Sequence, residues 1–253
     1  MKHYVDNYII NPSHQLTVAL IGCGGTGSQV LTSLGRMDYA LQQLGHPGLH
    51  VTAYDPDIVT HANCGRQLFA ENEVGFNKAG LLVTKINMFF GTQWDSKSEP
   101  YKSGCSLTNF VISCVDTAKA RLEIAKNLSG HSGYDTTHFY YWLDFGNNAT
   151  TGQVVLGTAG HQIPQPKNKQ GCVKILKSVT DLFDLSKVDD ADSGPSCSLA
   201  EALNKQDLFV NSTLANIGMA LMWKMFKYGV IDMHGAFLNL DTMKVNPIKI
   251  EKI

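Results

Sequence analysis

The stretch LTVALIGCGGTG, residues 16–27, decides how this chain of 253 residues folds. Its first half, Leu16 to Ile21, is a short continuous apolar run after polar residues, which predicts a buried strand. The glycines that follow let the backbone turn tightly and approach an anion closely. From Ser28 to Leu44, apolar residues recur at helical spacing, so we expect a helix whose first N–H groups face the glycine loop.

A second strand is predicted from Leu49 to Tyr54, after a turn at residues 45–48. Strand, glycine loop, helix and strand form a βαβ unit, so the two strands are expected to be parallel. This pattern favours an α/β fold of the Rossmann-like, doubly wound kind, with a mostly parallel sheet. In such folds ligands bind outside the carboxyl ends of the strands.

The rest of the chain continues the α/β pattern and ends in strand-like runs that predict an antiparallel C-terminal extension. Helices are predicted over residues 78–90, 117–128 and 207–228, and strands over residues 110–115, 139–145, 152–157 and within 235–249. In the middle helix, Ala118, Leu122, Ile124 and Ala125 are expected to face inward. The Asp-, Ser- and Gly-rich segment 184–206 is expected to be a mobile loop. With no internal repeat or linker, residues 1–253 are interpreted as a single domain.

Composition excludes several classes of protein. A net charge of −1 and the absence of a basic run argue against non-specific nucleic-acid binding. No apolar run reaches the roughly 18 residues of a membrane span, and the first 15 residues lack an apolar signal core, so we expect a cytoplasmic protein without a membrane partner. The six cysteines contain no CxxC pair, which makes zinc unlikely.

The glycine loop is a candidate phosphate cradle. Alternatively, its glycines serve only the tight turn at which the helix starts. Its candidate residues are Gly22, Gly24, Gly25 and Gly27. Asp55 ends the second predicted strand, where an acidic residue can accept hydrogen bonds from a ribose. Alternatively, Asp55 caps the turn before Pro56.

Up to this point NAD and ATP fit equally well. Asn63, Arg66 and Lys78 then add an amide and two cations within about two dozen residues of Asp55. Because fixed cations neutralise the charge of a triphosphate as pyrophosphate departs, these residues favour ATP. Lys78 taken alone is more typical of a solvated surface.

Asp116 ends the buried run at residues 110–115 and precedes a predicted helix. A carboxylate at that place could hold the Mg²⁺ that accompanies ATP, or it could cap the helix.

Together these residues resemble the ThiF/MoeB/HesA family, the adenylating fold of ubiquitin-activating enzymes, and most of all the ThiF-like proteins of the PRTRC gene system. The resemblance is carried by the glycine loop and, in order, by Asp55 and Asp57, by Asn63, Arg66 and Gln67, by Lys78, and by Asp116 and Arg121. It covers residues 16–126 well, as the nucleotide-binding part, and residues 127–253 loosely, as a partner-binding part.

The resemblance implies a homodimeric enzyme that binds Mg-ATP and adenylates the C-terminal carboxylate of a small ubiquitin-like, β-grasp protein. Asp55 would hold the ribose, Asn63, Arg66 and Lys78 would contact the phosphates, and Asp116 would coordinate Mg²⁺. The chain departs from the family in two ways. It lacks the two zinc-binding CxxC pairs, and Met1 to Gln15 contains no arginine to reach a partner subunit's ATP, a role that Lys2 could take.

Cys197, in the sequence GPSCSL, resembles the cysteine to which ubiquitin-activating enzymes pass the acyl group. The alternatives are a buried structural thiol or a remnant of a lost zinc site. Cys172 is a weaker candidate, whereas Cys23 and Cys64 are interpreted as packing residues within the nucleotide motifs. The leading hypothesis is therefore an ATP-dependent adenylyltransferase, with an NAD-dependent oxidoreductase and a catalytically reduced nucleotide-binding scaffold as alternatives.

Overall fold

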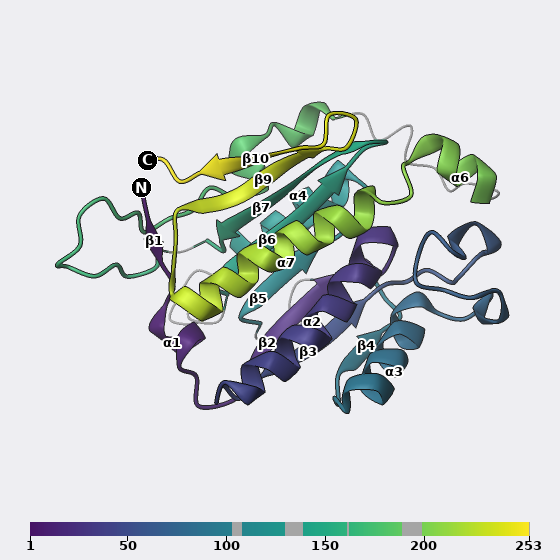
Figure 1. The fold of residues 1–253 in the computed structure, drawn as a ribbon, viewed down its shortest axis with the longest axis horizontal. Helices are drawn as coiled ribbons and strands as arrows, with labels where there is room; N and C mark the ends of the chain where they lie inside the picture. Colours follow the sequence, from purple (N-terminus) through teal and green to yellow (C-terminus); the bar gives the residue numbers. More distant parts are fainter. Residues whose placement is uncertain (103–107, 130–138, 161, 189–198, 253) are drawn as a thin grey trace.

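The structure of the chain is a computed structural model that describes residues 1–102, 108–129, 139–160, 162–188 and 199–252. These residues form an eight-stranded sheet with helices on both faces (Figure 1). In spatial order the strands are β10 (Lys244–Lys249), β9 (Met233–Asn239), β7 (Thr151–Thr158), β6 (Tyr141–Asn147), β5 (Phe110–Ser113), β2 (Leu16–Ile21), β3 (Leu49–Tyr54) and β4 (Asp95–Lys97).

The order of the strands confirms the predicted doubly wound sheet. Strands β2 to β6 pair in parallel with one another, whereas β7, β9 and β10 add antiparallel pairs, as predicted for a C-terminal extension. From β2 the chain builds outward through β3 and β4, then returns to the other side of β2 with β5 and β6. The carboxyl ends of β2 and β5 therefore flank the switch point at which open α/β sheets bind ligands.

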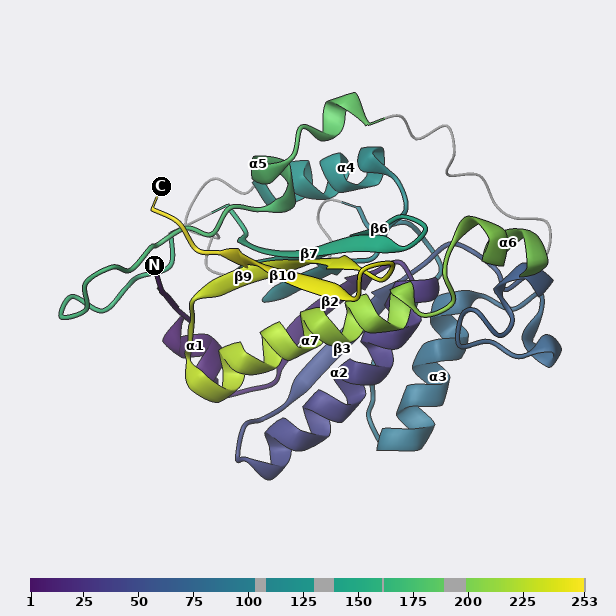
Figure 2. The same cartoon turned by 45° about the horizontal axis from the view of Figure 1, so that its top comes forward.

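Helices cover the two faces of the sheet unequally (Figure 2). On one face lie α2 (Gly25–Gln43), α3 (Lys78–Phe90) and α7 (Val210–Tyr228), and on the other lie α4 (Ala118–Ser129) and α5 (Val179–Leu182). Neighbouring residues of the central strands alternate between these faces, because successive side chains in a strand point in opposite directions. Thus Leu20 and Phe110 pack in the core under α2 and α7, while Ile21 and Val111 pack in the core under α4.

Several predicted elements agree with the structure residue by residue, and others differ at their ends. The strands at 16–21 and 49–54 and the helix at 78–90 have the predicted bounds, whereas α2 begins at Gly25 instead of Ser28. The inward face predicted for α4 is wrong at Leu122, which is 41% exposed. Arg121 turns inward instead, toward a buried carboxylate, and places Leu122 on the solvent side.

Short elements were missing from the prediction. Within the segment expected to be a mobile loop, the chain forms a 3₁₀ turn at Leu185–Lys187 and the helix α6 (Leu199–Lys205), which lies close to the 3₁₀ turn at His61–Asn63. At the N-terminus, β1 (His3–Tyr4) pairs with β8 (Val230–Ile231) and is followed by α1 (Asn7–Ile10). In the described part of the chain, no helix combines the length and apolar character that a membrane crossing requires.

Candidate functional site

The glycine loop closes tightly between β2 and α2. Gly22 has a φ of +90°, a conformation that favours glycine, and its N–H donates to the carbonyl of Tyr54 over 2.9 Å. A Cβ on Gly27 would lie 1.9 Å from the carbonyl oxygen of Gly22, so α2 can approach the loop only with glycine there. Among the described residues no side chain caps α2 at Gly24, which leaves the N–H groups of its first turn for an anion.

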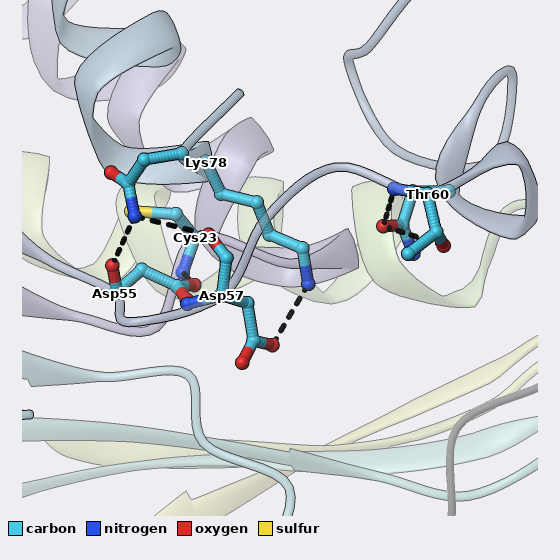
Figure 3. A network of polar contacts seen from close by, with 7 residues as sticks. Cys23, Asp55, Asp57, Thr60 and Lys78 are labelled. Atoms are coloured by element: carbon cyan, nitrogen blue, oxygen red, sulfur yellow. Dashed lines mark hydrogen bonds and ion pairs between the residues drawn. The ribbon is translucent and has the colours of Figure 1, made fainter. Parts of the chain in front are cut away.

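Asp55 ties the loop to the end of β3. Its carboxylate accepts a hydrogen bond from the Cys23 N–H over 2.6 Å and another from the Asp57 N–H over 2.8 Å (Figure 3). Burial raises the pKa of Asp55, and the two N–H donors and the charge of Lys78 oppose that rise. Each carboxylate oxygen can accept a second hydrogen bond, so these contacts are compatible with the ribose role predicted for Asp55.

Lys78 reaches into the same corner from the first turn of α3. Its Nζ lies 3.0 Å from the Oδ2 of Asp57, and the side chain is only 10% exposed (Figure 3). Asn77, the N-cap of α3, accepts from the Gly80 N–H and donates its amide to the carbonyls of Asp55 and Asp57. Asn77 thus holds the start of α3 and the Asp-x-Asp turn together. Because Lys78 is buried there, its interpretation as a solvated surface residue is wrong.

Asn63 and Gln67 follow on the loop beyond Asp57. The Oδ1 of Asn63 accepts from the N–H and the hydroxyl of Thr60, so this oxygen caps a turn (Figure 3). Because phosphate oxygens accept hydrogen bonds, a phosphate contact of Asn63 would use its amide nitrogen. Gln67 lies against the glycine loop, and its Oε1 is buried with no hydrogen-bond partner within the described ranges.

Asp116 follows the carboxyl end of β5, and Arg66 lies near enough to act on it through its charge. The Nη1 of Arg66 donates to the Oε1 of Gln206 over 2.8 Å, while its Nε is buried and has no hydrogen-bond partner among the described residues. Burial lowers the pKa of Arg66, and the nearby charge of Asp116 opposes that effect. The side chain of Asp116 is exposed, yet desolvation by the surrounding protein raises its pKa. The charges of Lys78, Arg121 and Arg66 oppose that rise. The predicted cations and the predicted metal ligand therefore share one site.

Arg121 also acts on Asp116 through its charge, but its hydrogen bonds are made elsewhere. Its Nε lies 3.0 Å from both carboxylate oxygens of the buried Asp144, its Nη2 donates to the carbonyl of Phe145 over 2.7 Å, and its Nη1 donates to the carbonyl of Thr117. The last contact holds the turn that follows Asp116. Among the residues that carry the family resemblance, Arg121 thus has a structural role.

A model of the ThiF family matches residues 12–252. The chain belongs to the ThiF family. A search of curated protein sequences gave no match. Among solved structures, the chain is similar to PaaA in its selenomethionine form (15% identity, TM-score 0.58, covering 94% of this chain and 65% of PaaA).

It is also similar to Escherichia coli MccB solved with MccA (14% identity, TM-score 0.63, covering 97% of this chain and 66% of MccB). For Escherichia coli MccB solved with ATP, the identity is 13%, the TM-score 0.58, and the coverage 96% of this chain and 65% of MccB. At these identities the likeness shows a shared fold. The chain spans about 65% of the length of these solved structures. Closeness to the PRTRC branch of the ThiF family stays a prediction.

Three residues at the site of this ThiF-family chain were missed from sequence. Thr26, Gln206 and Asn211 join the glycine loop to Arg66 by hydrogen bonds. Thr26 and Asn211 are separated by 185 positions, and no local pattern links them. Asn211 lies in the first turn of α7, in the half of the chain that was expected to bind a partner.

The cysteines of the ThiF-family chain divide by burial. Cys23 and Cys64 are buried, as expected for packing residues, and burial raises the pKa of the Cys23 thiol. Cys172 is half-buried in a loop beside the N-terminal strand, where Lys2 pairs with it. Cys197 lies outside the described residues, so its role stays a prediction.

The residues present fit a nucleotide with its metal. In the described ranges no three His, Cys, Asp or Glu side chains gather to hold a metal by themselves. Mg²⁺ at nucleotide sites is typically held by one or two carboxylates together with phosphate oxygens, a demand that Asp116 could meet. The unpartnered Arg66 Nε and Gln67 Oε1 are a buried donor and a buried acceptor beside the open end of α2. Such atoms are costly unless a ligand or water satisfies them.

Proposed function

We propose that this chain binds Mg-ATP and adenylates a carboxylate of its substrate, with release of pyrophosphate. The observation that carries the proposal is the uncapped N-terminus of α2, whose glycine loop is joined to Arg66 by hydrogen bonds through Asn211 and Gln206. Lys78 and Arg66 both act on Asp116 through their charges. Membership of the ThiF family and the fold shared with MccB, which has been solved with ATP, support the proposal.

In the proposed reaction an oxygen of the substrate carboxylate attacks the α-phosphorus of ATP. The bond from that phosphorus to the bridging oxygen breaks, so the products are an acyl-adenylate and pyrophosphate. Negative charge develops on the departing phosphates, and Arg66 and Lys78 would neutralise it. Lys78 can do so without leaving Asp57, because an ammonium group has three donors and Asp57 uses one.

Binding would be divided among the remaining residues. Gly22, Gly24, Gly25 and Gly27 would admit the phosphates to the helix end, Asp55 would hold the ribose, and Asp57, Asn63 and Gln67 would complete the walls. Asp116 would hold Mg²⁺, which would supply positive charge to the phosphate oxygens.

The substrate we propose is the C-terminal carboxylate of a small ubiquitin-like protein, held by residues 127–253 of this single domain. MccB has been solved with MccA in one structure and with ATP in another, which supports the proposal that this fold binds a nucleotide and a partner. Further parts of the proposal are a homodimer, a cytoplasmic location and transfer of the acyl group to Cys197.

Calorimetry with ATP and with NADH tests the nucleotide, and ATP–pyrophosphate exchange with Mg²⁺ and a β-grasp protein that ends in a glycine-rich tail tests the chemistry. We expect ATP binding, no NADH binding, and exchange that disappears in Arg66→Ala. Binding of NADH alone would contradict the proposal in favour of an oxidoreductase. Binding of ATP and partner without exchange would contradict the adenylation and favour a scaffold.

A further inference from the structure

A chain of hydrogen bonds connects the glycine loop to Arg66 through the start of α7. The Thr26 hydroxyl donates to the Oδ1 of Asn211 over 2.8 Å, and the Nδ2 of Asn211 donates to the Oε1 of Gln206 over 2.8 Å. The same Oε1 accepts from the Nη1 of Arg66 over 2.8 Å. One amide oxygen thus holds a cation from one half of the chain and an asparagine from the other.

The Thr26–Asn211 end of this chain of contacts is buried against the cradle. Asn211 is 4% exposed and Thr26 is 6% exposed. Asn211 also lies directly on the glycine loop, because a Cβ on Gly25 would come within 2.6 Å of its Nδ2. The amide of Asn211 is therefore in contact with the end of α2 that would receive the phosphates.

The bond to Gln206 leaves one edge of the Arg66 guanidinium unused. Gln206 accepts from Nη1, whereas Nε is buried and finds no hydrogen-bond partner in the part of the chain that the structure describes. The Nε–Nη2 edge of an arginine is one of the two edges that bind an oxyanion through paired hydrogen bonds. A buried donor on this edge is costly in the free protein and would be satisfied by a phosphate oxygen.

We propose that Gln206 and Asn211 are positioning residues of the nucleotide site. Gln206 holds Arg66 by Nη1 so that its Nε edge meets a phosphate of ATP, and Asn211 fixes Gln206 to the glycine loop. The inference rests on the proposed binding of ATP. It assigns part of that site to the junction of α6 and α7, in the half of the chain expected to bind the partner.

A merely structural role for Gln206 makes a different prediction. Loss of a structural contact would weaken every ligand of the site, or none of them. A positioning role that acts through Arg66 weakens only ligands with phosphates, and it vanishes once Arg66 is gone. Comparison of ATP with adenosine and a double-mutant cycle with Arg66 separate the two roles.

The test is calorimetric titration of ATP and adenosine into the full chain, wild type and Gln206→Leu, each with Arg66 and with Arg66→Ala. Leucine keeps similar bulk but lacks the acceptor. With Arg66 present, we expect Gln206→Leu to raise the Kd for ATP by roughly tenfold and to change that for adenosine by less than about twofold. In the Arg66→Ala background, adding Gln206→Leu should change the Kd for ATP by less than about twofold. Gln93→Leu, at an exposed position, should match the wild type throughout.

The failures are distinguishable. A wild-type chain that binds no ATP contradicts the proposed function itself. Wild-type ATP binding with an unchanged Kd in Gln206→Leu overturns the inference alone, as does an equal loss of adenosine or a loss that persists in Arg66→Ala. If Gln206→Leu does not fold by circular dichroism, Gln206→Ala removes the same acceptor with less bulk, and the same outcomes apply.

Discussion

At the scale of single residues, two lysines of α3 show how burial separates a site residue from a surface residue. Lys78 is 10% exposed and faces Asp57 beside the cradle, whereas Lys85 is 41% exposed and pairs with Glu73 over 2.6 Å. We expect Lys78→Ala to lower ATP–pyrophosphate exchange by about 10²–10³-fold, because a fixed cation opposite developing charge is lost. The rate is measured at saturating ATP.

Lys85→Ala is the matched control, since it removes the same charge from the same helix. Its exchange rate should stay within about twofold of the wild type, because the partners of Lys85, Glu73 and the carbonyl of Leu68, are not predicted site residues. Equal losses in both variants would show that the effect comes from the helix or from net charge, and would contradict the assignment of Lys78.

Two glycines provide a second test at this scale. In Gly25→Ala, the new Cβ would come within 2.6 Å of the Asn211 amide, so we expect a loss of about 1–3 kcal/mol of unfolding free energy together with weaker ATP binding. In Gly80→Ala, within α3, the nearest atom would be 3.6 Å away, and we expect a gain of about 0.5–1 kcal/mol. Urea unfolding measures both. A stable Gly25→Ala would contradict the contact between Asn211 and the loop.

The sequence allowed some of these residues to be placed and not others. Asp55 could be placed because it directly follows an apolar run and strand ends fix their neighbours. The orientation of Asn63 could not, because its oxygen turns to Thr60. The phosphate contact of Arg66 stays a prediction, and its bond to Gln206 could not be foreseen, because it spans 140 positions and depends on how α6 and α7 pack.

At the scale of elements, long apolar segments were predictable and short polar ones were not. Strands β2 and β3 are buried apolar runs, so their bounds follow from composition. Strand β4 consists of Asp95, Ser96 and Lys97, all exposed, and forms only because the edge of β3 offers it partners. No local signal distinguishes such a segment from a loop.

The helix α4 depends on a buried ion pair. Arg121 bonds both oxygens of Asp144, which also accepts from the hydroxyl of Ser113. We expect Arg121→Met to cost about 3–5 kcal/mol, because it leaves a carboxylate buried without its cation. Thermal or urea unfolding measures the loss.

The double variant Arg121→Met, Asp144→Asn tests the reason for that loss. Asparagine removes the buried charge and still accepts from Ser113, so most of the stability should return. If the double variant is as unstable as Arg121→Met, the cause is lost packing of the arginine stem, and the electrostatic explanation is wrong.

At the scale of the whole molecule, the chain closes on itself at both ends of α7. Near its start, Asn211 meets the glycine loop, and past its end, β8 pairs with β1. The N-terminal ammonium donates to the carbonyl of Ile250, so the two ends of the chain lie together (Figure 1). Residues far apart in sequence thus complete both the site and the fold, which is why a division at residue 126 does not describe the site.

The buried His3 connects the N-terminal strand to the rest of the molecule by hydrogen bonds. Its Nδ1 donates to the carbonyl of Val173 over 2.9 Å, so its Nε2 accepts from the hydroxyl of Tyr141 over 2.9 Å. Burial lowers the pKa of His3, the hydrogen bond to Val173 opposes that change, and the charge of His234 adds to it. The ring is therefore neutral in the folded chain.

The free energy of unfolding should accordingly fall as the pH is lowered through about 6.5, the ordinary pKa of histidine in an unfolded chain. Below that pH the unfolded chain binds a proton that the folded chain refuses, so stability rises with pH across the interval down to the folded pKa. Urea unfolding at pH 7.5 and pH 5.5 measures the slope. His3→Gln keeps an amide donor and acceptor but cannot be protonated, so its stability should depend less on pH, even if it is lower at pH 7.5. The same slope in both chains would mean that other groups, such as His234 with its lowered pKa, cause the whole dependence.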